Sequence, residues 1–306
     1  MTVQEFKINA TKKLALTSKS PALDVEIFLT FCLRLTKTQI LMQRDAQIEP
    51  EKLSWLENAV ERRSHGLPVA YITGHKEFYG YDFFVTPDVL IPKPDTEILV
   101  ERATRAIAQK IAVDDGRPLS VCDMFTGSGC IALSVAKNLL ENFSVPKERL
   151  PNFTLADISE NALKIAQKNQ SALFDAPDGL PRPHFSFIRS NLFDAIAPAF
   201  DVILANPPYV PAALAQELLK DGRSEPILAL DGDVTADGRH STSDDGLEVI
   251  RNFLPQAKNH LAPHGMIFME AGEYNAEDAA KIARKLGFKT RIHKDLEGQL
   301  RVLELE

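Results

Sequence analysis

The four residues Asn206-Pro207-Pro208-Tyr209 combine groups that could hold a planar, amide-like nitrogen. They follow the apolar run 200–205, which is typical of a strand, so they should lie at its carboxyl end, where open α/β sheets bind ligands. Two consecutive prolines keep the segment extended, and its carbonyls should find no partner in the chain. Asn206 adds an amide with an acceptor and two donors, and Tyr209 adds a flat face. The alternative interpretation is a proline-stiffened turn with an incidental tyrosine.

A second chemical element lies earlier, where an apolar strand, a glycine turn and an apolar helix follow one another over residues 119–136. Gly127 and Gly129 permit a tight turn and a close approach of a ligand to the backbone. Their spacing is not the Gly-x-Gly-x-x-Gly of dinucleotide sites, so an adenosyl group without phosphates fits better. Asp157 follows the short strand 153–156 and could bind the ribose hydroxyls of that group. It could instead simply cap the next helix, as Asp often does.

Together these segments resemble the S-adenosylmethionine-dependent methyltransferases, and more narrowly the HemK/PrmC family of protein-(glutamine-N5) methyltransferases. Segments 68–74, 90–97 and 225–232 look like further signatures of that family, so the resemblance covers nearly the whole chain. The Asn-Pro-Pro-Tyr loop alone is shared with adenine-N6 methyltransferases of nucleic acids, whereas the Ile-Pro-Lys-Pro-Asp-Thr-Glu segment is much more specific. The resemblance implies S-adenosyl-L-methionine as cofactor and, as substrate, the glutamine in the Gly-Gly-Gln motif of peptide-chain release factors.

The resemblance also implies roles for individual residues. The expected cofactor-binding residues are Phe125, Thr126, Gly127, Ser128, Gly129, Asp157, Asn191, Leu192 and Asn206. The expected substrate-binding residues are Asn206, Pro207, Pro208 and Tyr209, and the first, second and fourth of these are expected to be catalytic. No metal is expected, because the sequence has no His/Cys/Asp/Glu cluster with ligand spacing.

The chain departs from the family pattern in four places. Phe125 stands where the family has the first glycine of its loop, which should narrow the pocket near the methionine part of the cofactor. Lys93 replaces the usual arginine and loses a planar fork of donors. Asn191 occupies the position of an expected acidic residue. The polar segment 231–246 is longer than the resemblance predicts; we expect a solvated insertion, with a lid over the site as the alternative.

Methyl transfer to an amide nitrogen is difficult because resonance delocalises the nitrogen lone pair into the carbonyl. If the Asn206 side-chain oxygen and the Pro207 carbonyl accept the two amide hydrogens, they place negative potential where positive charge develops. Tyr209 would hold the amide plane for an in-line approach. We expect no general base, because the methylated amide is strongly acidic after transfer.

The hydrophobic pattern predicts three parts of the chain. Residues 1–72 have helix-spaced apolar positions and should form a small bundle that recognises the substrate protein, since they carry no catalytic motif. Residues 73–92 should form a hairpin around Gly80 and a proline-rich linker. Residues 93–306 alternate between strand and helix patterns. This alternation predicts an α/β domain whose mostly parallel sheet has helices on both faces and ends in an antiparallel hairpin. The resemblance implies that this is a methyltransferase domain with a doubly wound, seven-stranded Rossmann-like sheet.

Composition limits the class of function. The 306 residues are 44% hydrophobic and carry a net charge of −7, which disfavours a protein that grips the nucleic-acid backbone directly. The three scattered cysteines suggest a reducing compartment, and neither the apolar run of a signal peptide nor a run of about 18 apolar residues is present. We therefore expect a cytoplasmic monomer, with release factors as partners and no membrane; a cleaved organellar leader is the minor alternative. The open alternatives are methylation of a ribosomal-protein glutamine, adenine-N6 methylation of nucleic acid, and non-catalytic cofactor binding.

Overall fold

The computed structural model describes residues 1–113, 116–174, 182–197, 199–220, 225–235 and 238–306. These residues pack as two compact units. One unit holds residues 1–75 and the end of helix α9 (Ala212–Lys220), and the other holds residues 76–216 together with the described residues from Glu225 onward. Within the described ranges, no helix is both long enough and apolar enough to cross a membrane.

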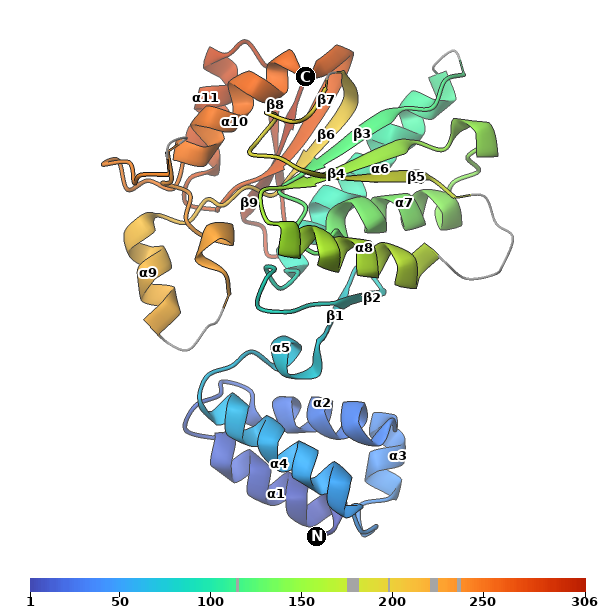
Figure 1. Ribbon diagram of the computed structural model, residues 1–306, viewed down its shortest axis with the longest axis vertical. Coiled ribbons are helices and arrows are strands. Elements are labelled where there is room, and N and C mark those ends of the chain that lie inside the picture. Colours follow the sequence, from blue (N-terminus) through green and yellow to red (C-terminus); the bar gives the residue numbers. More distant parts are fainter. Residues whose placement is uncertain (114–115, 175–181, 198, 221–224, 236–237) are drawn as a thin grey trace. The chain divides into compact units, whose positions relative to one another are not determined.

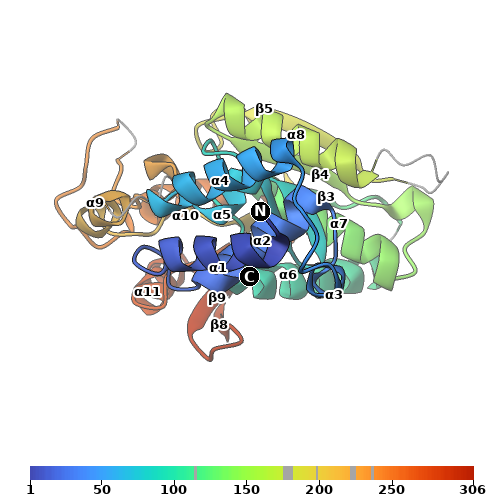
Figure 2. The same ribbon diagram turned by 90° about the horizontal axis from the view of Figure 1, so that it is seen from below.

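The first unit is a small helical bundle, as predicted (Figures 1 and 2). Its helices are α1 (Val3–Leu14), α2 (Pro21–Leu33), α3 (Lys37–Met42), α4 (Pro50–Ser64) and α5 (Val69–Thr73). Thr2 and Thr36 start α1 and α3 with capping boxes, and proline opens α2 and α4, where its missing N–H costs nothing. Fully buried side chains from three helices fill the core: Leu14, Phe28, Leu29 and Leu56.

A two-stranded hairpin, β1 (His75–Phe78) and β2 (Tyr81–Phe84), follows the bundle. Its two turn residues, Tyr79 and Gly80, both have positive φ, at +52° and +80°. This is the backbone that a two-residue hairpin favours, because its twist matches that of the strands. The predicted hairpin around Gly80 is confirmed.

The second unit contains the predicted seven-stranded sheet, in the order β5-β4-β3-β6-β7-β9-β8. Five neighbouring strands are parallel, and β9 is antiparallel to β7 and β8, so the predicted antiparallel closing hairpin is confirmed. Met124 pairs with both Ala156 and Ala205, so β3, β4 and β6 end level with one another. The strands are β3 (Ser120–Met124), β4 (Asn152–Asp157), β5 (His184–Arg189), β6 (Phe200–Ala205), β7 (Leu261–Glu270), β8 (Thr290–Lys294) and β9 (Leu300–Leu305).

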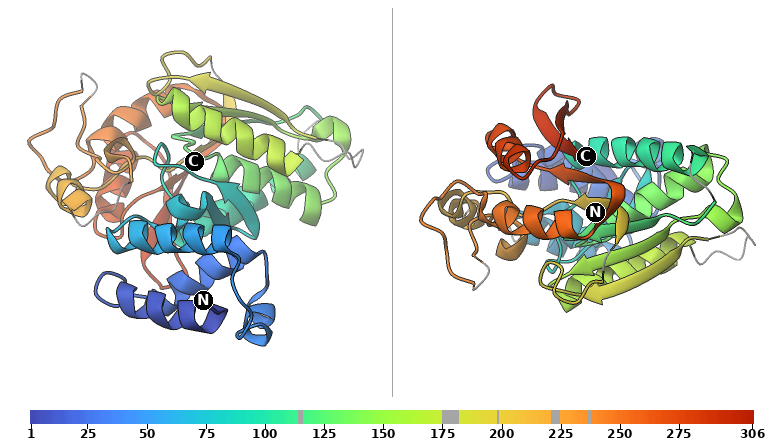
Figure 3. Two further views of the ribbon diagram at one scale, coloured as in Figure 1. Left: turned by 60° about the horizontal axis from the view of Figure 1, so that its bottom comes forward. Right: turned by 90° about the horizontal axis from the view of Figure 1, so that it is seen from above.

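Helices cover both faces of this sheet, as the α/β prediction requires. One core contains side chains of α6 (Glu97–Val113), α7 (Cys130–Asn142) and α8 (Glu160–Phe174), and Figure 3 shows α8 running along the β4–β5 side. The other core contains α10 (Glu248–Asn259) and α11 (Ala276–Lys285). Successive strand residues alternate between the two cores, which the period of two in a strand explains. Short 3₁₀ turns lie at Pro94–Thr96, Lys147–Arg149 and Ile227–Ala229.

Candidate active site

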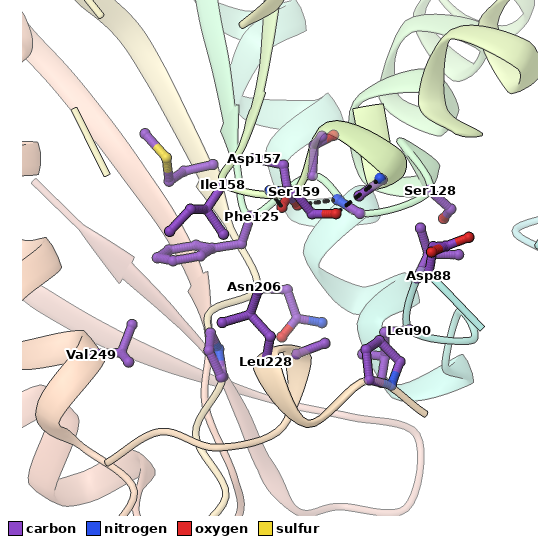
Figure 4. A pocket seen from close by; sticks show the side chains of 18 of the residues that line it. Asp88, Leu90, Phe125, Ser128, Asp157, Ile158, Ser159, Asn206, Leu228 and Val249 are labelled. Carbon is purple, nitrogen blue, oxygen red and sulfur yellow. Dashed lines mark hydrogen bonds between the residues drawn. The ribbon is translucent and has the colours of Figure 1, made fainter. Parts of the chain in front are cut away.

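A cavity of about 340 Å³ lies at the carboxyl ends of the parallel strands, within the unit that holds the sheet. Residues that directly follow β3, β4, β5 and β6 line it, as expected for ligand sites of doubly wound sheets. Figure 4 shows Phe125, Asp157 and Asn206 around this space. Of the predicted site residues, Gly129, Pro207 and Tyr209 do not line the cavity, whereas these nine do: Phe125, Thr126, Gly127, Ser128, Asp157, Asn191, Leu192, Asn206 and Pro208.

Backbone hydrogen bonds hold the glycine turn between β3 and α7. The N–H of Thr126 donates to the Ala156 carbonyl at 3.0 Å, and the N–H of Gly129 donates to the Thr126 carbonyl at 2.8 Å. A Cβ on Gly129 would lie 3.0 Å from Cδ1 of Leu133 and 3.2 Å from Cβ of Ala166. Gly129 therefore allows the start of α7 to pack closely on α8, and it shapes the turn without lining the cavity.

Asn169, in the middle of α8, ties the glycine turn to the hairpin. Its Nδ2 donates to the carbonyls of Ser128 at 2.9 Å and Phe84 at 3.0 Å, and its Oδ1 accepts from the N–H of Phe84 at 2.8 Å. An asparagine is unfavourable inside a helix unless its amide has such partners. The helical pattern around Asn169 does not identify these partners.

Phe125 explains why glycine is preferred at the first position of the turn. Its φ of +63° is left-handed, which costs roughly 1–2 kcal/mol for a residue with a Cβ. The ring lines the cavity and meets the ring of Phe253 edge to face, with centroids 5.5 Å apart. This aromatic contact offsets part of the backbone cost. Phe125 therefore fills space that a glycine would leave to a ligand.

Asp157 is held by two backbone N–H groups, and its neighbour Ser159 caps the next helix. Its Oδ2 accepts from the N–H of Gly127 and its Oδ1 from the N–H of Ser159, both at 2.9 Å. Ser159 in turn accepts from the N–H of Ala162 through its own hydroxyl, so Ser159 caps the start of α8. Burial raises the pKa of Asp157, although these backbone N–H groups oppose the rise. Asp157 lines the cavity, and its carboxylate has further lone pairs that can accept hydrogen bonds.

Asp123 supports the same turn from below. It is fully buried, and its Oδ2 accepts from the Thr126 hydroxyl at 2.7 Å and from the N–H of Ala132 at 3.2 Å. Burial raises its pKa to about 7, against an ordinary value of 3.8, and the charge of Asp157 adds to the rise. The glycine turn thus rests on a carboxyl that titrates near neutral pH.

Asn206 lines the cavity and is oriented by Thr96. Its Nδ2 donates to Oγ1 of Thr96 at 3.4 Å, which engages the donor side of the amide and leaves Oδ1 available as an acceptor. No hydrogen bond from the described part of the chain reaches the Pro207 carbonyl. Two acceptors at the end of β6 are therefore without a partner among the described residues, and of Asn206 and Pro207 only Asn206 lines the cavity.

Tyr209 faces away from the cavity and anchors the loop. Its hydroxyl donates to Oε1 of Glu270 at 2.9 Å, and burial raises its pKa well above the ordinary value. Its carbonyl accepts from Nδ2 of Asn275 at 3.0 Å and from the hydroxyl of Tyr274 at 3.3 Å. The expectation that the carbonyls of this loop lack partners is therefore wrong for Tyr209. The stacking role predicted for its ring stays a prediction.

Lys93 replaces the arginine of the family pattern and pairs with Glu225. Its Nζ lies 2.7 Å from Oε1 of Glu225, and the N–H of Ile91 donates to the same oxygen at 3.2 Å. Both segments line the cavity, so this pair joins two of its walls. A single donor from lysine is sufficient because the second donor comes from the backbone.

The ends of segment 231–246 are built into the fold, so the expectation of a solvated insertion is wrong there. Asp233 is fully buried, and its carboxylate accepts from the N–H groups of Ala212 at 3.0 Å and Gly246 at 2.9 Å. A Cβ on Gly246 would lie 2.2 Å from the Tyr209 carbonyl oxygen, so glycine is needed for this packing. Residues 236–237 of the segment lie outside the described residues.

One cysteine also lies in the cavity wall. Cys130 lines it, but burial raises its pKa to about 12, so it stays a thiol at neutral pH. Among the residues that the structure describes, no group of three or more His, Cys, Asp or Glu side chains is placed to hold a metal ion.

Comparison with known proteins adds sequence relationships to this geometry. The PrmC N-terminal domain family matches residues 8–74, and the methyltransferase small domain family matches residues 97–234. A release factor glutamine methyltransferase of Koribacter versatilis is 34% identical over 288 residues, 93% of this chain and 91% of that protein. One from Moorella thermoacetica is 35% identical over 292 residues, 94% of this chain and 91% of that protein.

Among solved structures, a methyltransferase from Pyrococcus furiosus aligns with a TM-score of 0.47 at 15% identity, covering 84% of this chain and 98% of its own. The curated relatives match over almost their whole length, at more than 30% identity. The chain therefore belongs to the release factor glutamine methyltransferase family, and it is a methyltransferase.

Proposed function

We propose that this enzyme transfers the methyl group of S-adenosyl-L-methionine to the side-chain amide nitrogen, N5, of the glutamine in the Gly-Gly-Gln motif of peptide-chain release factors. The observation that carries the proposal is that Asn206, with its Oδ1 free, shares one cavity with the glycine turn and Asp157. Family membership supports the substrate class, because the relatives are named for it.

The residues around the cavity fit an adenosyl cofactor. Asp157 would accept hydrogen bonds from the ribose hydroxyls. The backbone at Gly127 can be approached closely, because the nearest atom to a Cβ placed on this glycine is the Phe125 carbonyl oxygen, at 4.0 Å. Asn191 and Leu192 line the cavity after β5, where they would meet the adenine ring. Thr126, Ser128 and Gly129 hold the turn that supports these contacts. When bound, the cofactor supplies an electrophilic methyl group on a sulfonium.

The chain's own residues would prepare the amide nitrogen for that methyl group. Asn206 Oδ1 and the Pro207 carbonyl would each accept one amide hydrogen, which draws electron density back to the nitrogen and stabilises the charge that develops during transfer. Pro208 closes the loop rigidly and lines the cavity beside the amide. Tyr209 keeps the loop in place, and no general base is required because the methylated amide loses its proton readily.

Two alternatives predict different methyl acceptors. A glutamine in a ribosomal protein could use the same site, whereas an adenine-N6 substrate would need a basic surface that a net charge of −7 does not favour. The enzyme and labelled S-adenosylmethionine should be incubated in three separate reactions, with release factors, with ribosomal proteins and with DNA. Label in the release factors alone supports the proposal, and label in DNA or in ribosomal proteins alone overturns it.

We also propose a division of labour along the chain: residues 1–72 recognise the substrate protein, residues 73–92 are hairpin and linker, and residues 93–306 carry transfer. The match of the PrmC N-terminal domain to residues 8–74 supports a separate first part. Leu41 and Met42 of α3 are 70% and 80% exposed, which suits a contact surface. The double substitution of Leu41 and Met42 by serine should raise KM for the release factor but not KM for a short glutamine peptide. Equal rises in KM for the two substrates would contradict this role. Leu296→Ser, at a 96% exposed site in the other unit, is the control.

The proposed setting is the cytoplasm, where release factors act, with the enzyme as a monomer that touches no nucleic acid itself. The three cysteines are all free thiols, which fits a reducing compartment. Light scattering of the purified enzyme, alone and with a release factor, would test the monomer and the one-to-one complex.

A further inference from the structure

Arg301 is a cation on β9 that is only 9% exposed and does not line the cavity. Its carbonyl accepts from the N–H of Ala271 at 2.9 Å, which fixes this part of β9 beside the residue that follows β7. Moving a charged group out of water costs free energy unless the group is paired. A guanidinium at such a position therefore indicates contacts that use its charge and its shape.

Three carboxylates from three separate segments pair with this guanidinium. Its Nε donates to Oδ2 of Asp295 at 3.1 Å, in the turn between β8 and β9. Its Nη2 lies 3.3 Å from Oδ2 of Asp95, in the 3₁₀ turn Pro94–Thr96. The same Nη2 lies 4.0 Å from Oε2 of Glu273, between β7 and α11. One side chain thus connects these three segments.

Asp95 links Arg301 to the first residue of the Asn-Pro-Pro-Tyr loop. Asp95 and Thr96 are consecutive residues of the same short turn, in which the N–H of Thr96 donates to the Lys93 carbonyl at 3.1 Å. The Thr96 hydroxyl accepts from Nδ2 of Asn206 at 3.4 Å, near the limit for a hydrogen bond. A small displacement of this turn would therefore release the Asn206 amide.

Glu273 links Arg301 to the last residue of the same loop. The two residues after Glu273 are Tyr274 and Asn275, which donate to the Tyr209 carbonyl at 3.3 Å and 3.0 Å. The pair of Arg301 with Glu273 is longer than the pair with Asp95, so we expect it to contribute less. The supports of both ends of the loop thus meet at one guanidinium.

We propose that Arg301 is a positioning residue for methyl transfer. Through Asp95 it holds the turn that orients Asn206, and through Glu273 it holds the segment that binds the Tyr209 carbonyl. This inference rests on the proposed function, because the orientation of Asn206 matters for turnover only if Asn206 accepts from the substrate amide. A displacement of about 1 Å at a reacting group can cost about a hundredfold in rate, so a support remote from the cavity can control turnover.

Asp95→Asn tests the link to Asn206. The variant removes the charge and keeps the shape of the side chain, and Arg301 retains its other two carboxylates. The Asp95 side chain is 44% exposed, so loss of this ion pair should change the melting temperature little. We expect kcat for the release factor to fall about tenfold, while the Kd for S-adenosylmethionine stays within about twofold.

Asp278→Asn is the matched control for this substitution. Asp278, on α11, is also a half-exposed aspartate in an ion pair, with Lys281 at 2.8 Å. Neither member of that pair lines the cavity. This variant should keep kcat within about twofold of wild type, as expected for a surface ion pair.

Two further variants test the arginine itself and its weaker link. Arg301→Lys keeps the positive charge but replaces the planar fork of donors by one ammonium group, which should not hold both Asp95 and Glu273. Its kcat should fall at least as far as that of Asp95→Asn. Glu273→Gln should lower kcat by about threefold, because its contact with Arg301 is longer. If Arg301→Lys does not fold, the Asp95 variants still decide the proposal.

The double variant Asp95→Asn/Asn206→Ala decides whether the link acts through Asn206. With the amide of Asn206 removed there is nothing left to orient, so Asp95→Asn should cost no more than about twofold in that background. A further loss of about tenfold there would show that Asp95 acts on the fold in general and would overturn the proposal. Wild-type kcat in Asp95→Asn or in Arg301→Lys, or an equal loss in Asp278→Asn, would also overturn it.

These outcomes are distinct from failure of the proposed function. A wild-type enzyme that binds S-adenosylmethionine but labels no release factor would refute the function itself. A wild-type enzyme that labels the release factor, with kcat unaffected by the Asp95 and Arg301 substitutions, would refute only the positioning role.

Discussion

The two loops that meet at the cavity are held by different means. The glycine turn, residues 123–129, is fixed by backbone hydrogen bonds and by left-handed φ values at Phe125, Gly127 and Gly129. The side chains of Asp123, Asp157 and Asn169 add further hydrogen bonds to it. The Asn-Pro-Pro-Tyr loop is fixed by side chains from other elements: Thr96 at one end and Glu270 and Asn275 at the other.

This difference matches what each loop would have to do. A tight turn with left-handed φ values at its glycines lets a cofactor approach the backbone closely and in the same way each time. A loop fixed by distant side chains can have one amide aimed at a reacting atom, at the cost of depending on groups far along the chain. Changes in the glycine turn should therefore act on the cofactor side of the cavity, and changes at Thr96, Glu270 or Asn275 on the Asn-Pro-Pro-Tyr loop.

The largest expected effect comes from Asp123, the buried carboxyl that supports the glycine turn. Folding raises the pKa of Asp123 from 3.8 to about 7, so this carboxyl contributes stability that is present below about pH 4 and lost as pH rises through 7. Three pKa units correspond to about 4 kcal/mol. Asparagine can place its oxygen where Oδ2 accepts, because Oδ1 has no partner among the described residues.

The free energy of unfolding of the wild type minus that of Asp123→Asn should therefore fall by up to about 4 kcal/mol between pH 4 and pH 7. Urea unfolding of both proteins across this range measures the difference, and carboxyls common to both cancel. A flat difference curve would mean that Asp123 does not titrate there.

The next largest effect is expected for Asn206→Ala, which removes the amide of the Asn-Pro-Pro-Tyr loop. Loss of one preorganised acceptor should lower turnover of the release factor by about a hundredfold or more, with the Kd for S-adenosylmethionine nearly unchanged. Single-turnover methylation and calorimetry on the same preparation separate the two quantities. Asn259→Ala, at an exposed site near the end of α10, is the matched control. A loss of less than about fivefold would remove Asn206 from the mechanism.

Asp157→Ala should weaken cofactor binding and have little effect on turnover. The Kd for S-adenosylmethionine should rise by an amount equal to about 1.5–3 kcal/mol, the range for a hydrogen bond to a charged group. At saturating cofactor, turnover should recover most of its wild-type value. Calorimetry measures the affinity, and an unchanged Kd would show that Asp157 serves only to fix Gly127 and Ser159.

The smallest effect sharpens the role of backbone strain in the glycine turn. Phe125→Gly and Phe125→Ala both remove the ring contact with Phe253, but only alanine keeps a Cβ at a φ of +63°. The glycine variant should be more stable than the alanine variant by about 1 kcal/mol. Thermal unfolding of the pair measures this, and equal stabilities would mean that the turn relaxes without cost.

The fold followed from the sequence because its signals are local. Alternating strand and helix patterns predicted the doubly wound sheet, and the glycines predicted its first turn. Two acceptors at the cavity, Asp157 and Asn206, were predicted for the same reason: each directly follows an apolar strand, and the strands end level.

The supports of the site could not be predicted in this way. Thr96, Asn169, Glu270 and Asn275 are ordinary polar residues in helix or strand patterns, and their partners lie far away in sequence. The prediction for segment 231–246 was wrong at its ends because the composition of the segment is that of a solvated loop. In the structure Asp233 is buried, and its carboxylate accepts from the N–H of Ala212, far away in the sequence. The composition of a segment shows how polar it is, but it does not identify the groups with which its polar atoms form hydrogen bonds.

The most direct test of the account is tandem mass spectrometry of a release factor after incubation with the wild-type enzyme and S-adenosylmethionine. The account predicts one added methyl group, located on the side-chain amide of the Gly-Gly-Gln glutamine, and none on a release factor in which glutamate replaces that glutamine. Methylation at any other residue, or undiminished methylation of the glutamate form, would contradict it.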